Sequence, residues 1–245
     1  MRNAPPDITF LAGQTEQETL SRWQARAREI DVGTLLGDVQ SLGIIVPHAD
    51  DETLGSGGLI ALAATLGISV TVTILTDGAA SHPGSNTWPP AALARQRQQE
   101  ARDAVKCLAG TAATVQFLDA PDGGLAGNRN LADRIGPADV YITCWRDDPH
   151  PDHRAAFFIA RTVARRRGSR LLAFPLWVLT TSLPVPNLPL FRICVTDFLQ
   201  HKQIALAAHR SQLGELVEDV IGFVLDKDLQ RLFVRDDELY LEVIA

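Results

Sequence analysis

Residues 43–52 of this 245-residue chain read GIIVPHADDE, and the interpretation of the whole sequence depends on them. The segment 43–46 is short, apolar and β-branched, as expected of a buried strand. Residues 53–67, which follow, are rich in Leu and Ala at helical spacing. One histidine and three acidic residues therefore lie where a strand leads into a helix, which is where open α/β sheets bind ligands. Such a density of nitrogen and oxygen donors suits a divalent metal ion.

A second donor cluster strengthens this interpretation. Residues 148–153 read DPHPDH, and they follow the apolar run 140–144 and precede the helix-like run 154–166. Acidic residues at a helix start also offset the macrodipole and cap free N–H groups, which alone could explain the acids of the first cluster. Two donor clusters at two strand tips would, however, face one crevice, and this favours a metal site.

The pairing of PHADDE with a downstream DPHPDH resembles the LmbE-like, or PIG-L, family of metal-dependent N-deacetylases, whose usual motifs read (A/P)HPDDE and HPDH. The chain departs from this pattern at Ala49, where the family usually has proline, and this change leaves every donor in place. Further family motifs occur in order as Thr76-Asp77-Gly78, Arg97-x-x-Glu100, Pro121-Asp122-Gly123, Lys202 and His209-x-Ser211-Gln212. The resemblance covers about residues 43–212 and implies a three-layer, Rossmann-like α/β fold.

The resemblance also implies a set of roles. His48, Asp51 and His153 would bind the metal, and two histidines with one carboxylate are a standard set for catalytic zinc. Zn²⁺ is the expected ion, with Fe²⁺ or another divalent ion as the alternative. Asp50 is then left as the general base. His150 receives the oxyanion or leaving-group role.

Asp148 and Asp152 flank His150 in the sequence. We expect them either to hydrogen-bond the imidazole of His150 and keep it protonated, or to cap the helix that starts near His153.

Arg97 and Asp122 are candidate substrate contacts. From the sequence alone, Arg97 and Glu100 would form a solvent-exposed helical pair. The resemblance implies instead that Arg97 reaches substrate hydroxyls or the product carboxylate, to which a guanidinium is well suited. Asp122 is either an ordinary turn residue or, by the resemblance, an acceptor for a sugar hydroxyl.

Two irregular segments are expected to lie near the substrate. Loop 77–90 is rich in Gly, Ser and Pro, and long polar loops that follow a strand are usually functional. We expect a substrate-binding lid there, in which Trp88 stacks on a sugar face or anchors the loop, and His82 is a surface residue. The Pro-rich stretch 176–190 is expected to be an irregular cover, as a wall for an apolar part of the substrate or as a subunit contact.

Alternating strand-like and helix-like segments predict a mostly parallel sheet with helices on both faces. By length the chain is a single domain, 1–245, in which residues 1–42 are an N-terminal helical extension. The predicted strands are 43–47, 69–76, 114–118, 138–144, 170–175 and, at an edge of the sheet, 239–243; the predicted helices are 53–67, 91–109, 129–136 and 153–167. Residues 55–58 read GSGG, which does not form the GxGxxG of a dinucleotide site, so we expect these glycines to let a helix pack closely on the sheet.

Composition excludes several classes of function. The net charge is −6, and basic residues are scattered apart from Arg165, Arg166 and Arg167, which argues against nucleic acid as a partner. Cys107, Cys144 and Cys194 form no CxxC motif, and we expect buried free thiols. Neither a signal peptide nor a membrane span is recognisable, so a cytoplasmic location is expected. A homo-oligomer is left open.

The sequence thus predicts a zinc-dependent hydrolase that removes an acetyl, or another acyl, group from the amide nitrogen of an N-acetylglucosamine-type sugar or its conjugate. One alternative is a non-haem Fe(II) oxygenase, because two histidines and one carboxylate also form its facial triad. Another is a non-catalytic metal- or sugar-binding module. Asp50 and His150 disfavour both alternatives, since neither would use them.

Overall fold

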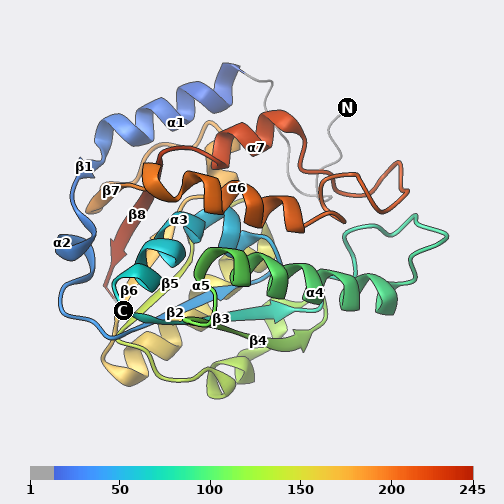
Figure 1. Ribbon diagram of the computed structural model, residues 1–245, viewed down its shortest axis with the longest axis horizontal. Helices are drawn as coiled ribbons and strands as arrows, with labels where there is room; N and C mark the ends of the chain where they lie inside the picture. The colour runs from blue at the N-terminus through green and yellow to red at the C-terminus, as the bar shows by residue number, and fades with distance from the viewer. Residues whose placement is uncertain (1–13, 245) are drawn as a thin grey trace.

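The computed structural model describes residues 14–244, and within them eight strands form one sheet (Figure 1). The order across the sheet is β1-β7-β8-β6-β5-β2-β3-β4. Neighbouring strands are parallel except β8, which runs antiparallel to both β6 and β7. The strands are β1 (Arg28–Glu29), β2 (Ser41–Val46), β3 (Ser69–Thr76), β4 (Ala113–Ala120), β5 (Val140–Cys144), β6 (Arg170–Phe174), β7 (Leu190–Cys194) and β8 (Asp237–Val243).

Helices cover both faces of this sheet. The α-helices are α1 (Gln14–Arg26), α2 (Val32–Leu36), α3 (Asp51–Thr65), α4 (Pro90–Ala109), α5 (Pro151–Arg167), α6 (Leu199–Ala208) and α7 (Lys227–Phe233). The 3₁₀ helices are η1 (Leu125–Gly127), η2 (Arg129–Arg134), η3 (Trp177–Thr180) and η4 (Thr196–Phe198). Helices α3, α4 and α6 pack together, whereas α5 packs with η1, η2, β5 and β6. The predicted mixed α/β architecture is confirmed.

The order in which the chain adds strands to the sheet reverses between the parallel neighbours β2 and β5. From β2 the chain passes through α3 to β3 on one side, and from β5 it passes through α5 to β6 on the other. Right-handed crossovers therefore put α3 and α5 on opposite faces. Since β2 and β5 are neighbours, with Ile45 paired to Thr143, the segments that follow them meet at one crevice. Open α/β sheets bind their ligands at such a switch point.

Glycines allow α3 to lie close to its neighbours, as the GSGG segment predicts. A Cβ on Gly55 would lie 2.3 Å from the ring of Phe174, and one on Gly58 would lie 2.6 Å from the Cβ of Val195. Helix α3 is buried over most of its length, and its amino-terminal turn carries Asp51 into the crevice.

Two predictions about elements are wrong, and a third is only partly right. The segment 239–243 is part of β8, which lies inside the sheet between β6 and β7, and Tyr240 is fully buried. The alternation of apolar and polar residues in the segment 239–243 suggests a strand with one buried face, but both faces of β8 are covered. Residues 129–136 do not form an α-helix, because the structure has the 3₁₀ helix η2 there. The N-terminal extension is only partly helical, since it also supplies β1 to the sheet, and residues 1–13 lie outside the described range.

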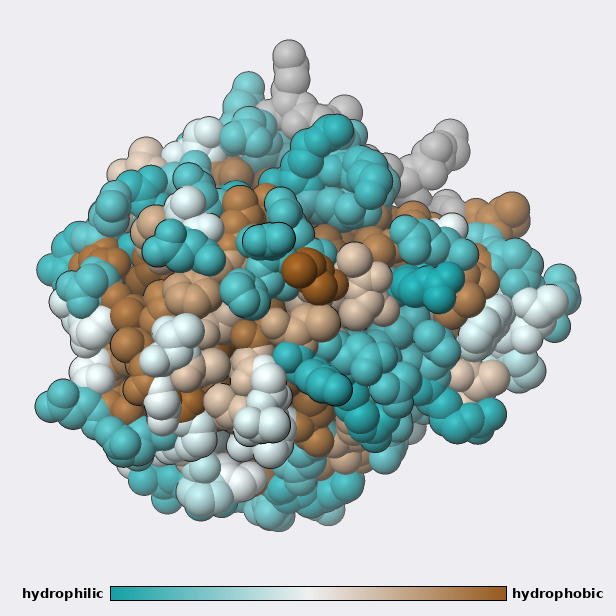
Figure 2. Space-filling model, in the orientation of Figure 1, coloured by the Kyte–Doolittle hydropathy of each residue, from teal (hydrophilic) through white to brown (hydrophobic). Residues whose placement is uncertain are grey.

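The cysteines differ from the prediction in their exposure. All three are free, but Cys107 and Cys194 are exposed and only Cys144 is buried. Figure 2 shows the face that carries α4 and α6, where hydrophilic side chains predominate over α4 and apolar ones are interspersed elsewhere. In the described residues we find no helix with the length and apolar character needed to span a membrane.

Candidate active site

Asp51 bridges two histidines at the switch point. Its Oδ2 lies 3.3 Å from Nδ1 of His48, and its Oδ1 lies 3.4 Å from Nε2 of His153. Two ligands of tetrahedral zinc, at bond lengths of about 2.0–2.1 Å, are separated by roughly 3.3 Å. Asp51 therefore lies between the two histidines that are predicted to bind the metal with it, and one ring nitrogen each of His48, His150 and His153 also lie within 4.8 Å of one another.

His153 supplies an independent test of the fit to a metal. Its side chain is fully buried, and neither ring nitrogen has a hydrogen-bond partner among the described residues. An unsatisfied polar group in the interior is costly, and a cation bound through Nε2 would remove that cost. Asp148 Oδ1 lies 3.4 Å from Nδ1, in the place of the outer carboxylate that commonly orients a metal-binding imidazole. The residues present therefore fit a divalent ion.

Carboxylates dominate the electrostatics of this cluster. Burial lowers the pKa of His153, but Asp51 and Asp148 more than offset it and raise that pKa well above its usual value. His48 behaves in the same way, with Asp122 as the main carboxylate. Burial raises the pKa of Asp51, but the two histidines lower it far below its usual range. The site thus holds negative charge that attracts a cation.

Cys144 lies next to this cluster at the end of β5. Its sulfur and the donor atoms of Asp51 and His153 are all within 4.8 Å of one another. Burial raises the pKa of the thiol to about 12, so it stays protonated at neutral pH without a metal.

Asp50 precedes α3 in a strained conformation. Its φ is 136° and its ψ is −31°, a backbone conformation that residues other than glycine rarely adopt. The backbone N–H of Asp50 donates to Glu52 Oε2 at 3.0 Å, and its carboxylate does not cap the helix but lines the cavity 3.6 Å from Arg97. Burial raises the pKa of Asp50 to about 7, with Asp51 acting in the same direction and Arg97 against it. This carboxylate is therefore positioned and tuned to exchange a proton near neutral pH.

Buried hydrogen bonds also hold the first turn of α3, directly after Asp50. His209 lies 3.3 Å from Glu52 Oε1 and 3.2 Å from the hydroxyl of Thr53. Glu100 accepts from both the backbone N–H and the hydroxyl of Ser211. The His209-x-Ser211 motif thus packs under the site.

His150 is the N-cap of α5. Its Nδ1 accepts a hydrogen bond from the backbone N–H of Asp152 at 3.1 Å, which leaves the proton of the neutral ring on Nε2. Burial, with His48 and His153 nearby, lowers the pKa of His150 to about 2. The ring lines the cavity and can present its Nε2–H there as a neutral donor.

The prediction that Asp148 and Asp152 keep His150 protonated is therefore wrong. Neither carboxylate bonds the imidazole, and neither caps the helix with its side chain. Asp148 instead accepts from the backbone N–H groups of His150 and Trp177. Asp152 accepts from the backbone N–H groups of Gly123 and Leu125, and it lies 3.4 Å from Nε2 of His48.

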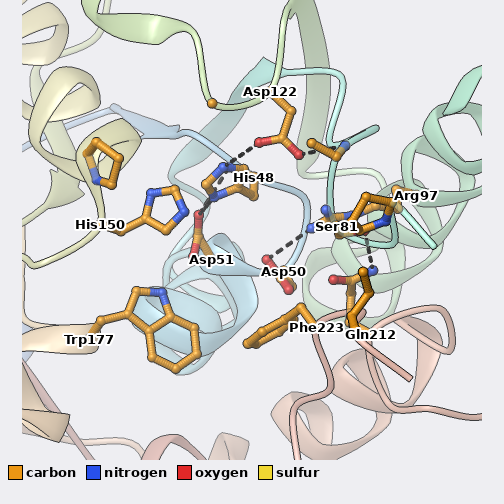
Figure 3. A pocket seen from close by; sticks show the side chains of 15 residues that line it. His48, Asp50, Asp51, Ser81, Arg97, Asp122, His150, Trp177, Gln212 and Phe223 are labelled. Carbon is orange, nitrogen blue, oxygen red and sulfur yellow. Dashed lines mark hydrogen bonds and ion pairs between the residues drawn. The ribbon is translucent and has the colours of Figure 1, made fainter. Parts of the chain in front are cut away.

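The cluster opens into a cavity of about 390 Å³ (Figure 3). One side of the cavity is polar and the other side is largely apolar. The lining consists of His48, Asp50, Asp51, Ala80, Ser81, Pro83, Arg97, Asp122, Gly123, His150, Pro151, Trp177, Gln212, Ile221 and Phe223. Volumes of this order accommodate small organic ligands.

Arg97 and Glu100 do not form a surface pair. Both are buried, and the Arg97 guanidinium donates to the carbonyls of Gly78 at 3.1 Å and Ala49 at 2.9 Å. Arg97 thereby fixes the residue that precedes Asp50, and it also lines the cavity.

Of the remaining residues considered from the sequence, Asp122 lies in the cavity, whereas Trp88 and His82 do not line it. Asp122 lines the cavity and lies 3.1 Å from Nε2 of His48, while its other oxygen accepts from the N–H of Ala80. Trp88 is half-buried and is not among the cavity residues, so the structure favours its role as a loop anchor. His82 is buried rather than exposed, because its ring packs against Gly222.

Sequence reasoning missed part of the cavity. The sequence marks Gln212 only as part of a family motif, and Ile221 and Phe223 belong to an irregular segment without any motif. Trp177 does form a wall, as suggested for the Pro-rich stretch.

Comparisons with known proteins agree with this geometry. Residues 44–164 match the family described as PIG-L, GlcNAc-PI de-N-acetylase. A probable N-acetyl-alpha-D-glucosaminyl L-malate deacetylase 2 of Bacillus cereus is 25% identical over 201 residues, which are 77% of this chain and 91% of the relative.

Solved structures share the fold. The N,N'-diacetylchitobiose deacetylase of Pyrococcus horikoshii superposes with a TM-score of 0.67 at 20% identity, over 98% of this chain and 95% of the other. GalB, the 4-carboxy-2-hydroxymuconate hydratase of Pseudomonas putida KT2440, superposes with a TM-score of 0.59 at 19% identity, over 84% and 97%. The fold is thus found with more than one chemistry, whereas the motifs of the two strand tips are those of one family. Residues 44–164 of the chain therefore form a PIG-L, or LmbE-like, domain match that contains both motifs.

Proposed function

We propose that the protein is a metal-dependent hydrolase that removes the acetyl group from the amide nitrogen of an N-acetylglucosamine-type sugar or its conjugate. The observation that carries the proposal is the buried imidazole of His153, which makes no hydrogen bond and lies beside Asp51, together with His48 on the other side of Asp51 and the strained Asp50 next to it at the cavity. The activities named for the Bacillus cereus relative and the Pyrococcus horikoshii structure support an acetylated amino sugar as the substrate class.

His48, Asp51 and His153 would hold the cation, with Asp148 orienting His153. When bound, a divalent ion polarises a carbonyl and lowers the pKa of water. Zn²⁺ is our proposed ion, because two imidazoles and one carboxylate are a common ligand set for catalytic zinc.

Asp50 and His150 perform the proton transfer and the charge stabilisation. Water attacks the carbonyl carbon of the amide, and Asp50 takes up the proton that the water loses. The Nε2–H of His150 donates to the oxygen on which negative charge develops. The C–N bond then breaks as the nitrogen takes the proton from Asp50, and the products are a free amine and acetic acid, which releases its remaining proton to solvent as acetate.

Asp122 and Arg97 complete the polar side of the cavity. Asp122 is ionised, since His48 and Arg97 lower its pKa despite burial, and it would accept hydrogen bonds from sugar hydroxyls. Arg97 acts mainly on Asp50, because two of its nitrogens are already bonded to backbone carbonyls. We further propose a cytoplasmic location, consistent with three free cysteines.

The test is release of acetate from a panel of N-acetylglucosaminides. We expect release to stop after chelation, to return with Zn²⁺, and to fall by orders of magnitude in Asp50→Ala. Release that is unaffected by Asp50→Ala would refute the role of the base. Turnover that needs oxygen and a 2-oxoacid, hydration of an unsaturated acid, or sugar binding without release would each refute the proposed function.

A further inference from the structure

The cavity has a continuous apolar wall opposite the carboxylates. Trp177 and Phe223 form its inner part, and their rings meet edge to face at 5.6 Å (Figure 3). Trp177 also packs edge to face on Phe233 at 5.4 Å, and its backbone N–H donates to Asp148 at 2.8 Å. The wall is therefore anchored to the same carboxylate that supports His153.

Ile221 extends this wall to the mouth of the cavity. Its side chain is 62% exposed, and the adjacent Val220 is 91% exposed. Seven large apolar side chains are exposed in the described part of the chain, and of these Ile221 is the one that lines the cavity. Apolar surface at the mouth of a binding site commonly marks a contact with a ligand.

The segment that carries Ile221 is held in place by its polar neighbours. Glu218 accepts from the backbone N–H groups of Asn86 and Thr87 and from the hydroxyls of Ser85 and Thr87. Asp219 accepts from the N–H of Gly84 at 2.7 Å.

The same segment is also bonded to the start of the loop. The N–H of Phe223 donates to the carbonyl of Ser81 at 2.9 Å. Loop 77–90 and residues 218–223 thus form one rim. The carboxylates of Glu218 and Asp219 are used within this rim, while Pro83, Ile221 and Phe223 of the rim line the cavity.

We infer that Trp177, Phe223 and Ile221 form a subsite for an alkyl or aryl group of the substrate. The physiological substrate is then an N-acylated amino sugar that carries an apolar substituent. This inference rests on the proposed function for the position of the sugar. A sugar ring alone could stack on Trp177, but it gives no reason for the exposed Ile221 beyond it.

An apolar group could belong to the aglycone or to the N-acyl chain, so two substrate series are needed. One series runs from methyl to octyl N-acetylglucosaminide, and the other from N-acetyl- to N-octanoylglucosamine. Release of free amine gives kcat/KM for each. Because a buried methylene contributes roughly fourfold, we expect at least about a tenfold gain along one series, which identifies the source of the group.

Variants of exposed apolar residues show whether the rim causes the gain in kcat/KM along the substrate series. Ile221 is exposed, so Ile221→Ser should fold normally, and we expect it to lose most of the gain, measured as the ratio of kcat/KM for the longest and the shortest substrate of the series. Ile204→Ser, at a residue on α6 that is 51% exposed and outside the cavity, is the matched control and should keep the gain. Equal kcat/KM along both series, or a gain that survives Ile221→Ser, would overturn the subsite.

A binding experiment separates this inference from the proposed function. Octyl glucoside, used below its micelle concentration, should bind the wild type measurably by calorimetry and bind Ile221→Ser at least about threefold more weakly. This result together with no amine release would support the subsite and reject the hydrolase. Amine release without any chain-length effect, and without octyl glucoside binding, would reject the subsite and support the hydrolase.

Discussion

Asp50 combines three unfavourable features in one residue. Its φ of 136° costs about 1–3 kcal/mol for a residue with a side chain. Its carboxylate is buried and lies next to a second carboxylate, that of Asp51, so its pKa rises to about 7. Glu52 and Arg97 both hold the peptide group that joins Ala49 to Asp50, and this fixes the backbone as it enters Asp50. Such strain at a cavity is typical of a residue positioned for chemistry.

Replacing Asp50 should separate stability from activity. Both Asp50→Gly and Asp50→Asn remove the base, so both should lower acetate release by orders of magnitude. Only glycine also relieves the backbone, and we expect the free energy of unfolding of Asp50→Gly to exceed that of Asp50→Asn by about 1 kcal/mol. Urea denaturation with chelator present measures this difference. A glycine variant less stable than the asparagine variant would show that the conformation is unstrained.

The raised pKa of Asp50 also predicts a pH dependence. In the metal-free folded state the pKa of Asp50 is about 7, so it keeps its proton up to that pH, whereas in the unfolded chain it loses the proton near its usual pKa of 3.8. The folded state therefore binds more protons between these values, and the stability from this group falls as the pH rises through that window. Asp50→Asn cannot ionise, so the wild type should lose stability relative to it between pH 4 and 7. Urea denaturation at several pH values tests this, and a constant difference would contradict it.

At the scale of elements, one carboxylate joins α3, α6 and β8. Glu238 accepts from the N–H groups of Gly58 and Leu59 at 2.8 and 2.9 Å, from Lys202 Nζ at 2.7 Å and from the hydroxyl of Tyr240 at 2.8 Å. Burial lowers the pKa of Lys202, and Glu238 opposes that shift. Since α3 carries Asp51 into the site, this buried connection links the C-terminal strand to the metal ligands.

Breaking the ion pair between Glu238 and Lys202 should lower the stability of the protein. Glu238→Gln leaves the ammonium of Lys202 buried without its counter-charge, and we expect a loss of about 3 kcal/mol in the free energy of unfolding. Lys227→Met, at an exposed residue of α7, is the control and should change stability by less than about 0.5 kcal/mol. Urea denaturation compares them, and a Glu238→Gln variant as stable as this control would contradict the account.

Local patterns predicted the elements whose residues are consecutive. The apolar runs before His48 and His150 predict β2 and β5, and the donors at their tips predict the cluster that we propose as the metal site. The position of β8 inside the sheet depends on pairing with β6 and β7, which no local pattern encodes. Burial of Arg97 and His82 likewise depends on distant segments. The tautomer of His150 depends on one backbone hydrogen bond at a helix start, which sequence does not display.

At the scale of the whole molecule, the strand order of the sheet brings the residues of the proposed active site together. The reversal between β2 and β5 brings together two segments about a hundred residues apart, and every proposed catalytic and metal-binding residue comes from one of them. The irregular segments around residues 77–90 and 218–223 then build the mouth of the cavity. The proposed catalytic and metal-binding residues lie in two motifs and could be predicted from them. The apolar wall comes largely from irregular segments without motifs and could not.

The central claim is that His48, Asp51 and His153 hold one divalent ion. The most direct measurement is the zinc affinity and stoichiometry of the wild type, of His153→Gln and of the exposed-site control His201→Gln, by titration against a competing chelator. We expect about one Zn²⁺ per chain for the wild type and the control, and an affinity at least about 100-fold lower for His153→Gln, since one of three ligands is lost. Equal affinity in His153→Gln, or no binding to the wild type, would contradict the account.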